Sequence, residues 1–237
     1  MNQFVPKREP HASRSGVFAV VPAFNEASTI GDVVRNTLRS VERVVVIDDA
    51  STDGTATVAL SAGAEVVRHP INLGQGAAIQ TGITHSLAEG ARYIVTLDAD
   101  GQHEPDQINL MMESMAAAHA DVALGSRFKG EAINIGRLRR VVLKLAVLFT
   151  RLTTGLDVSD SHNGFRMFSA AAARQLQIRQ NRMAHASEIL EEISRKRVSF
   201  VEVPVTVRYT DYSHAKGQSN LDSVNILLDL IMSWLRK

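Results

Sequence analysis

The chain has 237 residues, which is enough for one large domain with its own core and too few for two generous ones. Its formal net charge of +1 excludes the strongly basic composition of a general nucleic-acid binder, and the absence of cysteine excludes disulfides, thiolate metal sites and a cysteine nucleophile. Hydrophobic residues at 45% and charged residues at 22% are typical of a soluble globular protein, and we expect a cytoplasmic location.

The two ends of the chain differ in composition from its middle. Residues 1–15 contain basic residues and prolines but no apolar segment, so we expect a disordered tail and not a signal peptide. No stretch reaches the roughly 18 uninterrupted apolar residues of a spanning helix. The folded domain is expected at residues 16–210, followed at 211–237 by a loop and a C-terminal amphipathic helix packed on the domain or on a membrane.

Strands and helices alternate through the first half of the chain. Short apolar runs predict strands at 17–21, 44–47, 65–68, 92–97 and 122–124, and helices are predicted between them, the last at 105–119. These strands are β-branched and apolar on both faces, as parallel strands covered by helices must be. The sequence therefore predicts an α/β fold with a doubly wound, mostly parallel, Rossmann-like sheet and helices on both faces.

The second half is less regular. Helices are predicted at 136–152, 170–176 and 185–196 and a strand at 200–207, while residues 155–168 are polar and loop-like. The helix at 136–152 has no acidic residue, and four of its basic residues, Arg137, Arg140, Lys144 and Arg151, are predicted to lie together on one side. Its apolar stripe is predicted at Leu138, Val142, Leu145, Phe149 and Leu152, with Leu143 and Val147 away from the stripe. This pattern favours contact with a membrane surface, and packing on the sheet is the alternative.

The fourth predicted strand ends in two carboxylates, Asp98 and Asp100. Residues two apart on an extended backbone point the same way, so these side chains are expected to lie side by side. Two hard oxygen ligands suit Mg²⁺ or Mn²⁺, and Gln102 can add a carbonyl oxygen. A polar turn before the helix at Pro105 is the alternative, but ligands of open α/β sheets collect at the carboxyl ends of strands, which favours the metal site.

Other polar groups follow the remaining strands. Asp48 and Asp49 could accept hydrogen bonds from a ribose or a base edge, or could cap the next helix. Gly74 and Gly76 ease a helix start that could approach a diphosphate. The eight histidines are scattered singly, which predicts surface or capping residues. Cations that could receive phosphate oxygens are Arg127, Arg166, Lys216 and the basic face of the helix at 137–151.

Five motifs, taken together and in order, resemble the family 2 glycosyltransferases, and most closely the dolichyl- or polyprenyl-phosphate sugar transferases. They are the segments 21–26 (VPAFNE), 47–55 (IDDASTDGT), 72–78 (NLGQGAA), 97–102 (LDADGQ) and 160–166 (DSHNGFR). The resemblance covers nearly the whole chain from residue 17. It implies a GT-A fold and a nucleotide-diphosphate-sugar donor, either a UDP- or a GDP-sugar.

The resemblance also implies roles for individual residues. The nucleotide-sugar is expected to contact Pro22, Ala23, Asn25, Glu26, Asp48, Asp49, Gly76 and Asp98. The metal ion is expected at Asp98, Asp100 and Gln102, and the donor or acceptor phosphates at Arg127, Arg166 and Lys216. Asp100, Arg127, Arg166 and Asp160 form the expected catalytic set, in which Asp160 orients a cation or the donor sugar. Family members often carry Lys where this chain has Gln75 and Asn220, which removes two cations from the phosphate-handling region.

The function implied is inverting, metal-dependent transfer of a sugar to a polyprenyl phosphate. A soluble or saccharide hydroxyl acceptor is the alternative, and an inactive nucleotide-binding subunit is a third reading that the intact Asp98, Asp100 and Gln102 argue against. A lipid acceptor implies peripheral attachment to the inner face of a membrane, directly or through a membrane-protein partner. No nucleic-acid partner is expected.

Overall fold

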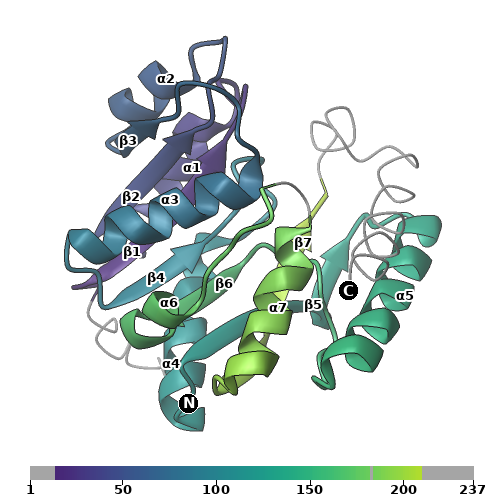
Figure 1. Ribbon diagram of the computed structural model, residues 1–237. Coiled ribbons are helices and arrows are strands. Elements are labelled where there is room, and N and C mark those ends of the chain that lie inside the picture. The colour runs from purple at the N-terminus through teal and green to yellow at the C-terminus, as the bar shows by residue number, and fades with distance from the viewer. Residues whose placement is uncertain (1–13, 182–183, 210–237) are drawn as a thin grey trace, which may run out of the picture.

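The computed structural model describes residues 14–181 and 184–209, which form a seven-stranded sheet of order β3-β2-β1-β4-β6-β5-β7 (Figure 1). The strands are β1 (Val17–Ala23), β2 (Arg43–Asp48), β3 (Glu65–Arg68), β4 (Tyr93–Thr96), β5 (Val122–Ile133), β6 (Arg166–Ser169) and β7 (Phe200–Arg208). The helices are α1 (Ile30–Thr37), α2 (Thr55–Ser61), α3 (Gln75–Ala88), the 3₁₀ turn η1 (Pro105–Gln107), α4 (Ile108–Ala118), α5 (Arg137–Thr154), α6 (Ala170–Gln175) and α7 (His185–Lys196).

The sheet is parallel except at β6, which runs antiparallel to both β4 and β5. The predicted α/β fold is therefore confirmed, with one correction: part of the segment expected to be a loop at 155–168 begins strand β6. This strand has only four residues, and its apolar pair Met167 and Phe168 is too short a run to stand out in the sequence.

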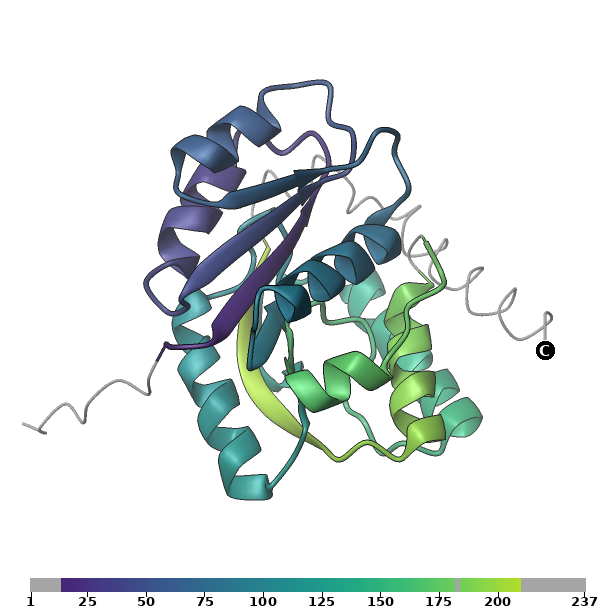
Figure 2. The same cartoon turned by 60° about the vertical axis from the view of Figure 1, so that its left-hand side comes forward.

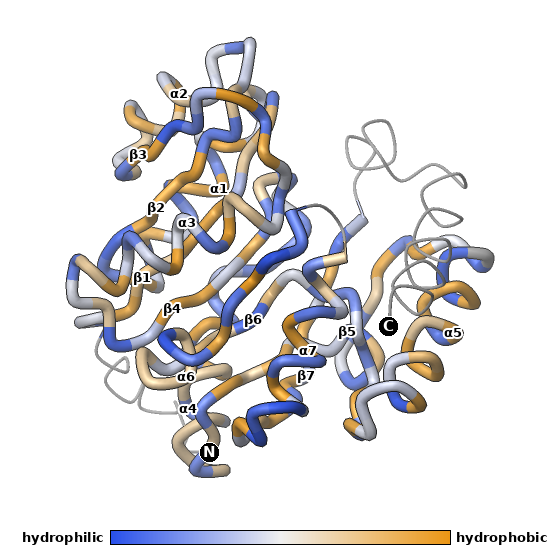
Figure 3. The backbone as a smooth tube through the Cα atoms, in the orientation of Figure 1, coloured by the Kyte–Doolittle hydropathy of each residue, from blue (hydrophilic) through white to orange (hydrophobic). Residues whose placement is uncertain are grey.

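Two apolar cores lie on opposite faces of the sheet. One joins the strands to α1, α2 and α4, and the other joins them to α3, α6 and α7. The tube in Figure 3 is accordingly hydrophobic along β1, β2 and β4, which are covered on both sides. Continuous apolar strands such as Val44–Ile47 follow from this double coverage, because both faces of each strand are removed from water.

The chain changes direction across the sheet between β1 and β4. From β1 it moves to β2 and then β3 on one side, and it returns to place β4 on the other side of β1 (Figure 2). The crevice at the carboxyl ends of two such strands is the usual ligand site of an open α/β sheet. Here it lies between Ala23, which ends β1, and Asp98, which follows β4.

Strand β5 is longer than the sequence predicted and is interrupted where it pairs with β7. The pairing runs from Val122 to Ser126, shifts register, and resumes at Glu131. A break of this kind redirects the side chains next to it. Arg127 lies within the break, and its side chain turns inward, where it is almost completely buried.

Helix α5 buries a different face from the predicted one. Leu143, Ala146, Val147 and Thr150 are buried, whereas Val142 and Phe149 are only partly buried and Leu145 and Leu152 are exposed. The predicted stripe was therefore wrong in phase. The helix carries apolar residues at two sets of helical positions, and only the tertiary contacts decide which set is covered.

None of the helices in the described part of the chain has both the length and the apolar composition needed to cross a membrane. Residues 1–13 of the predicted tail, the predicted C-terminal loop with Lys216 and the predicted C-terminal helix lie outside the described residues.

Candidate active site

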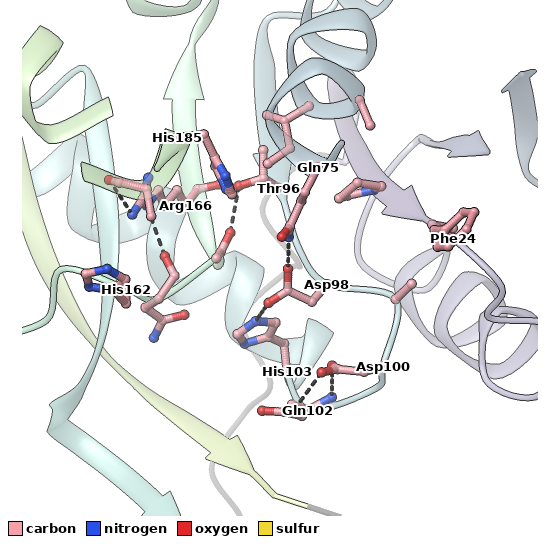
Figure 4. Close-up of a pocket in the computed structure, with 18 of the residues that line it drawn as sticks. Phe24, Gln75, Thr96, Asp98, Asp100, Gln102, His103, His162, Arg166 and His185 are labelled. Atoms are coloured by element: carbon pink, nitrogen blue, oxygen red, sulfur yellow. Dashed lines mark hydrogen bonds and ion pairs between the residues drawn. The ribbon is translucent and has the colours of Figure 1, made fainter. Parts of the chain in front are cut away.

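A cavity of about 450 Å³ opens at the carboxyl ends of β1 and β4 (Figure 4). It brings together most of the residues that the sequence singled out. The predicted residues that line it are Pro22, Ala23, Glu26, Asp49, Asp98, Asp100, Gln102, Arg127 and Arg166. Residues from β1 to β7 thus converge on one site from separate parts of the chain.

The two carboxylates after β4 are both held by neighbouring side chains. Asp98 accepts a hydrogen bond from Gln75 at 2.9 Å on Oδ1, and its Oδ2 lies 3.2 Å from Nε2 of His103. Asp100 accepts from the amide Nε2 of Gln102 at 2.6 Å and from the Gln102 backbone N–H at 3.1 Å. Figure 4 shows these five side chains as one cluster at the centre of the cavity.

The electrostatics of the two carboxyl groups differ. Burial acts to raise the pKa of Asp98, but the hydrogen bond and charge of His103, with the charges of His185 and Arg127, outweigh it and place that pKa below its ordinary value. Burial, followed by the charge of Asp98, raises the pKa of Asp100 to about 6. The ionised carboxylate of Asp98 therefore opposes ionisation of its buried neighbour Asp100.

A pair of neighbouring carboxyl groups in one cavity suits a divalent cation. Within residues 14–181 and 184–209, no three His, Cys, Asp or Glu side chains form a group that could hold a metal ion. A cation at this place would rest on Asp98, Asp100 and the Gln102 amide oxygen, and its other ligands would be waters or phosphate oxygens, as is usual for Mg²⁺. When bound, such an ion would neutralise charge on a departing diphosphate.

At one end of the cavity, Asp49 fixes the loop that begins α3. Its carboxylate accepts from the backbone N–H groups of Leu73 at 2.9 Å and Gly74 at 2.7 Å, and it lies 2.7 Å from Nδ1 of His69. The other ring nitrogen of His69 lies 3.0 Å from the Thr81 hydroxyl. Asp49 is thus both a cavity residue and the anchor of the loop that presents Gln75.

Three predicted nucleotide contacts lie outside the cavity lining. Asp48 is buried, accepts from the Ser51 backbone N–H at 3.0 Å and pairs with Arg68, so it holds the turn after β2 and does not cap α2, which begins at Thr55 without a side-chain cap. Asn25 accepts from the Thr52 backbone N–H at 2.8 Å. Gly76 donates its N–H to the Asn181 carbonyl at 2.9 Å. All three stabilise the loops around the cavity.

The surroundings of Gly76 explain why a glycine is needed at the start of α3. A Cβ atom there would lie 2.0 Å from the Gln180 carbonyl oxygen and 2.9 Å from the Cβ of His185. The segment before α7 therefore packs directly on the N-terminus of α3. The sequence could identify the glycine but not its reason, because the contact joins residues about a hundred positions apart.

Arg127 is locked into a buried ion pair. Its Nε lies 2.6 Å from Oδ2 of Asp160, and its other nitrogens donate to the Tyr209 hydroxyl and to the His162 carbonyl. Burial acts to lower the pKa of Arg127, but Asp160 and Tyr209 outweigh it and hold that pKa above its ordinary value. Asp160 itself does not line the cavity and acts on it through Arg127.

Arg166 is held by main-chain carbonyls. Its Nε donates to Asn163 at 3.0 Å, and its Nη2 donates to Ser161 at 3.1 Å and to Ala186 at 3.2 Å. Burial lowers the pKa of Arg166 to about 10, so the group remains a cation at neutral pH. The predicted contacts of Arg127 and Arg166 with phosphate stay predictions, because much of the hydrogen-bonding capacity of both groups is used to build the site.

A third arginine, Arg139 on α5, lines the same cavity and was not identified from the sequence. Its guanidinium lies over the Tyr209 ring, 5.2 Å from the ring centre. Its Nε is buried and has no hydrogen-bond partner among the described residues. It sits within a run of basic residues, Arg137 to Arg140, and nothing in that run distinguishes it from its exposed neighbours.

The histidines correct a sequence-based expectation. His69, His103 and His185 are buried beside the cavity or in its wall and are not surface residues. His162 also lines the cavity, and burial lowers its pKa to about 4, so its ring is neutral at pH 7. Single histidines carry no pattern in a sequence, and only the fold shows that four of the eight gather here.

Comparisons with known proteins agree with the motifs. Residues 18–177 match the family model "Glycosyl transferase family 2". The chain is 34% identical to an uncharacterized protein of Methanocaldococcus jannaschii, over 93% of both chains. It is 30% identical to a UDP-N-acetylglucosamine–dolichyl-phosphate N-acetylglucosaminyltransferase of Methanococcus voltae, over 91% of this chain and 95% of that protein.

Solved structures agree on the fold. A glucosyl-3-phosphoglycerate synthase from Mycobacterium tuberculosis, in complex with phosphoglyceric acid, superposes with a TM-score of 0.69 at 19% identity, over 91% of this chain and 79% of that one. The expected GT-A fold is thereby confirmed. With a family model that matches most of the chain and relatives that cover nearly all of it, the protein belongs to glycosyltransferase family 2 and is a glycosyltransferase.

Proposed function

We propose that this enzyme transfers a sugar from a nucleotide-diphosphate sugar to a polyprenyl phosphate, with inversion at the anomeric carbon and with a divalent cation. The observation that carries the proposal is the composition of one cavity, whose lining combines the carboxylate pair Asp98 and Asp100 with three arginines, Arg127, Arg139 and Arg166. The carboxylates, with a metal ion, suit the diphosphate of a donor, and the arginines suit the phosphate of an acceptor.

The relatives are consistent with this chemistry. The Methanococcus voltae protein is named for transfer to dolichyl phosphate, and a relative from Micrococcus luteus, 28% identical, is named an undecaprenyl-phosphate mannosyltransferase. A crystal structure of the similarly folded synthase contains Mn²⁺ and uridine diphosphate. We infer a UDP- or GDP-sugar donor and Mg²⁺ or Mn²⁺ for this chain.

An acceptor phosphate would need no general base. A phosphate monoester has its second pKa near 6 and is largely dianionic at neutral pH, whereas a sugar hydroxyl must lose its proton to a positioned base. The enzyme would instead screen the repulsion between two phosphates and align the attacking oxygen with the anomeric carbon. Asp160 is consistent with this division of labour, because its carboxylate is bound to Arg127 and is not part of the cavity lining.

Calorimetry of nucleotide binding tests the donor and metal assignments together. UDP and GDP are titrated with and without Mn²⁺, and the tight complex is expected only when nucleotide and cation are both present, since two carboxylates alone hold such a cation weakly. Because the pKa of Asp100 is about 6, Mn²⁺ affinity should fall as the pH drops through 6 and the carboxylate takes up a proton. Equal nucleotide affinity with and without cation would contradict the metal assignment.

Arg139→Ala is expected to raise the KM for a short-chain polyprenyl phosphate about 10- to 100-fold, the cost of one charge-assisted hydrogen bond. Its fold should be unaffected, because the guanidinium makes no buried ion pair in the described structure. Arg140→Ala is the matched control: Arg140 belongs to the same helix but is exposed and lies outside the cavity lining. Steady-state kinetics with detergent-solubilised acceptor give the KM of each variant. Equal KM changes in the two variants would contradict a role of Arg139 in acceptor binding.

A lipid acceptor requires contact with a membrane, and α5 offers a surface for it. Its exposed apolar residues are Val141, Leu145, Leu148 and Leu152, between 48% and 77% exposed and spaced by four, three and four positions. Such spacing forms one continuous stripe. The helix has no acidic residue and four exposed cations, which complement an anionic bilayer. Arg139 joins this same helix to the cavity, so we propose peripheral attachment through α5.

Vesicle flotation tests this attachment. The protein is expected to float with anionic phosphatidylglycerol vesicles at low salt, and Leu145→Glu with Leu148→Glu should abolish the binding. Leu60→Glu is the control, because Leu60 is 58% exposed on α2, which lies at the opposite side of the molecule from α5 (Figure 1). Wild-type protein that stays in the soluble fraction would contradict direct attachment.

A further inference from the structure

The segment between α5 and β6 forms a wall of the cavity that the proposed function does not yet use. His162, Asn163 and Gly164 all line the cavity. Figure 4 shows Phe24 on one side of Asp98 and Asp100, and His162 and Arg166 on the other. The carboxylates therefore stand between this wall and the Phe24 side of the cavity. Phe24 is flanked in the chain by predicted nucleotide contacts such as Ala23, so we call this side the nucleoside end.

The wall is held close to Asp98. The Thr96 hydroxyl, at the end of β4, donates to the Gly164 carbonyl at 2.7 Å. A Cβ atom at Gly164 would lie 2.7 Å from Oδ2 of Asp98, so any side chain there would displace the carboxylate or the wall. Only glycine permits this approach. Asn163 precedes this glycine in the chain and is therefore held near Asp98, a proposed metal ligand.

Asn163 carries an unused hydrogen-bond donor. The side chain is 2% exposed, its Oδ1 accepts from the Phe165 backbone N–H at 3.0 Å, and its carbonyl accepts from Arg166. Its Nδ2 is buried and has no hydrogen-bond partner among the described residues. A buried donor without a partner costs about 1–3 kcal/mol and is rare in native proteins, so a missing partner is to be expected where the side chain borders a ligand site.

The position of this amide and its lack of charge indicate which kind of group is its missing hydrogen-bond partner. A diphosphate bound with a cation at Asp98 and Asp100 joins the nucleoside on one side and the sugar on the other, so the sugar extends toward residues 162–164. We propose, on the basis of the proposed function, that Nδ2 of Asn163 donates a hydrogen bond to a hydroxyl oxygen of the transferred sugar. The neutral amide suits a neutral hydroxyl, whereas the nearby arginines suit phosphate.

The inference predicts selective loss of the sugar contribution to donor binding. Kd values with Mn²⁺ are measured by calorimetry for three pairs: UDP and UDP-glucose, UDP and UDP-N-acetylglucosamine, and GDP and GDP-mannose. Asn163→Ser retains an oxygen that can accept from Phe165 but loses the amide donor. For the pair that the wild type binds, this variant should weaken the sugar nucleotide about 10- to 100-fold relative to its diphosphate.

Asn72→Ala provides the matched control, because Asn72 is an asparagine that lines the same cavity from the loop that Asp49 anchors. It should change the affinities for diphosphate and sugar nucleotide by the same factor. Circular dichroism and the Tm verify that each variant is folded, and Asn163→Ala repeats the test without any polar group.

Each other outcome has a distinct meaning. An unchanged ratio of the two Kd values in both Asn163 variants overturns the inference. If that ratio is unchanged while the KM for polyprenyl phosphate rises, the amide serves the acceptor phosphate and the inference is again wrong. If the wild type binds neither UDP nor GDP in the presence of Mn²⁺, the proposed function fails, and the sugar contact fails with it.

Discussion

Asp100→Asn is expected to abolish sugar transfer while it makes the metal-free protein more stable. The substitution removes one of two carboxylates that would hold the cation, and loss of such preorganised electrostatic stabilisation costs at least about 10²–10³-fold in rate. Asp100 is also the group whose pKa is raised to about 6 by burial and by the charge of Asp98. Its ionisation at neutral pH therefore opposes folding.

The sign of the stability effect follows from that shift. A carboxyl group whose pKa is higher in the folded state favours folding fully when it is protonated, and this contribution is lost as the pH rises through about 6. At pH 8 without metal, the Asn variant should have a higher Tm than the wild type, and the gap should shrink below pH 6. Added Mn²⁺ should raise the Tm of the wild type and not that of the variant.

Asp106→Asn is the control for this prediction, because Asp106 is an exposed aspartate in η1, six positions further along the same segment. It should keep its activity and its response to Mn²⁺. Full transfer activity in Asp100→Asn, or a lower metal-free Tm at pH 8, would contradict the description of the carboxylate pair.

Arg127→Met is expected to lower the free energy of unfolding by about 3–5 kcal/mol, the usual cost of removing one partner of a buried ion pair. The loss leaves Asp160 charged and almost fully enclosed, since its side chain is 0% exposed in the pair. It also removes the hydrogen bonds that tie β5 to Tyr209 and to the His162 carbonyl. Urea unfolding followed by fluorescence or circular dichroism measures the change.

The double variant Arg127→Met with Asp160→Asn should recover part of that loss, because the isolated buried charge is gone. Arg35→Met is the surface control: the Arg35 and Asp32 side chains are 58% and 78% exposed, and such pairs contribute about 0–1 kcal/mol. A single Arg127 variant that unfolds at the wild-type urea concentration would show that the pair is not structural.

The carboxylate pair after β4 was predictable from the sequence because it depends on local rules. A short apolar run, the alternation of side chains along it and its place among strands and helices were enough to predict that Asp98 and Asp100 lie together at a strand end. The parallel strands were predictable for the same reason. Their residues are apolar on both faces, and this pattern distinguishes them from half-exposed strands.

The remaining features depend on contacts between distant segments. Strand β6 is defined by its neighbours β4 and β5, and the register break that turns Arg127 inward is defined by its partner β7. Arg139 and Asn163 are recognised only by what surrounds them: a tyrosine ring in one case and a missing hydrogen-bond partner in the other. The phase of α5 was misjudged because two apolar faces compete on one helix.

The acceptor is the central claim, and direct competition between two acceptors tests it. The enzyme is incubated with Mn²⁺, a sugar-nucleotide donor that it binds, and two short-chain lipids of equal length, a polyprenyl phosphate and the corresponding polyprenol. We expect sugar on the phosphate alone, with the anomeric configuration opposite to that of the donor by NMR, and a pH profile that follows ionisation of the lipid phosphate. Sugar transferred to the polyprenol or to an added saccharide, but not to the phosphate, would contradict the account and establish a hydroxyl acceptor.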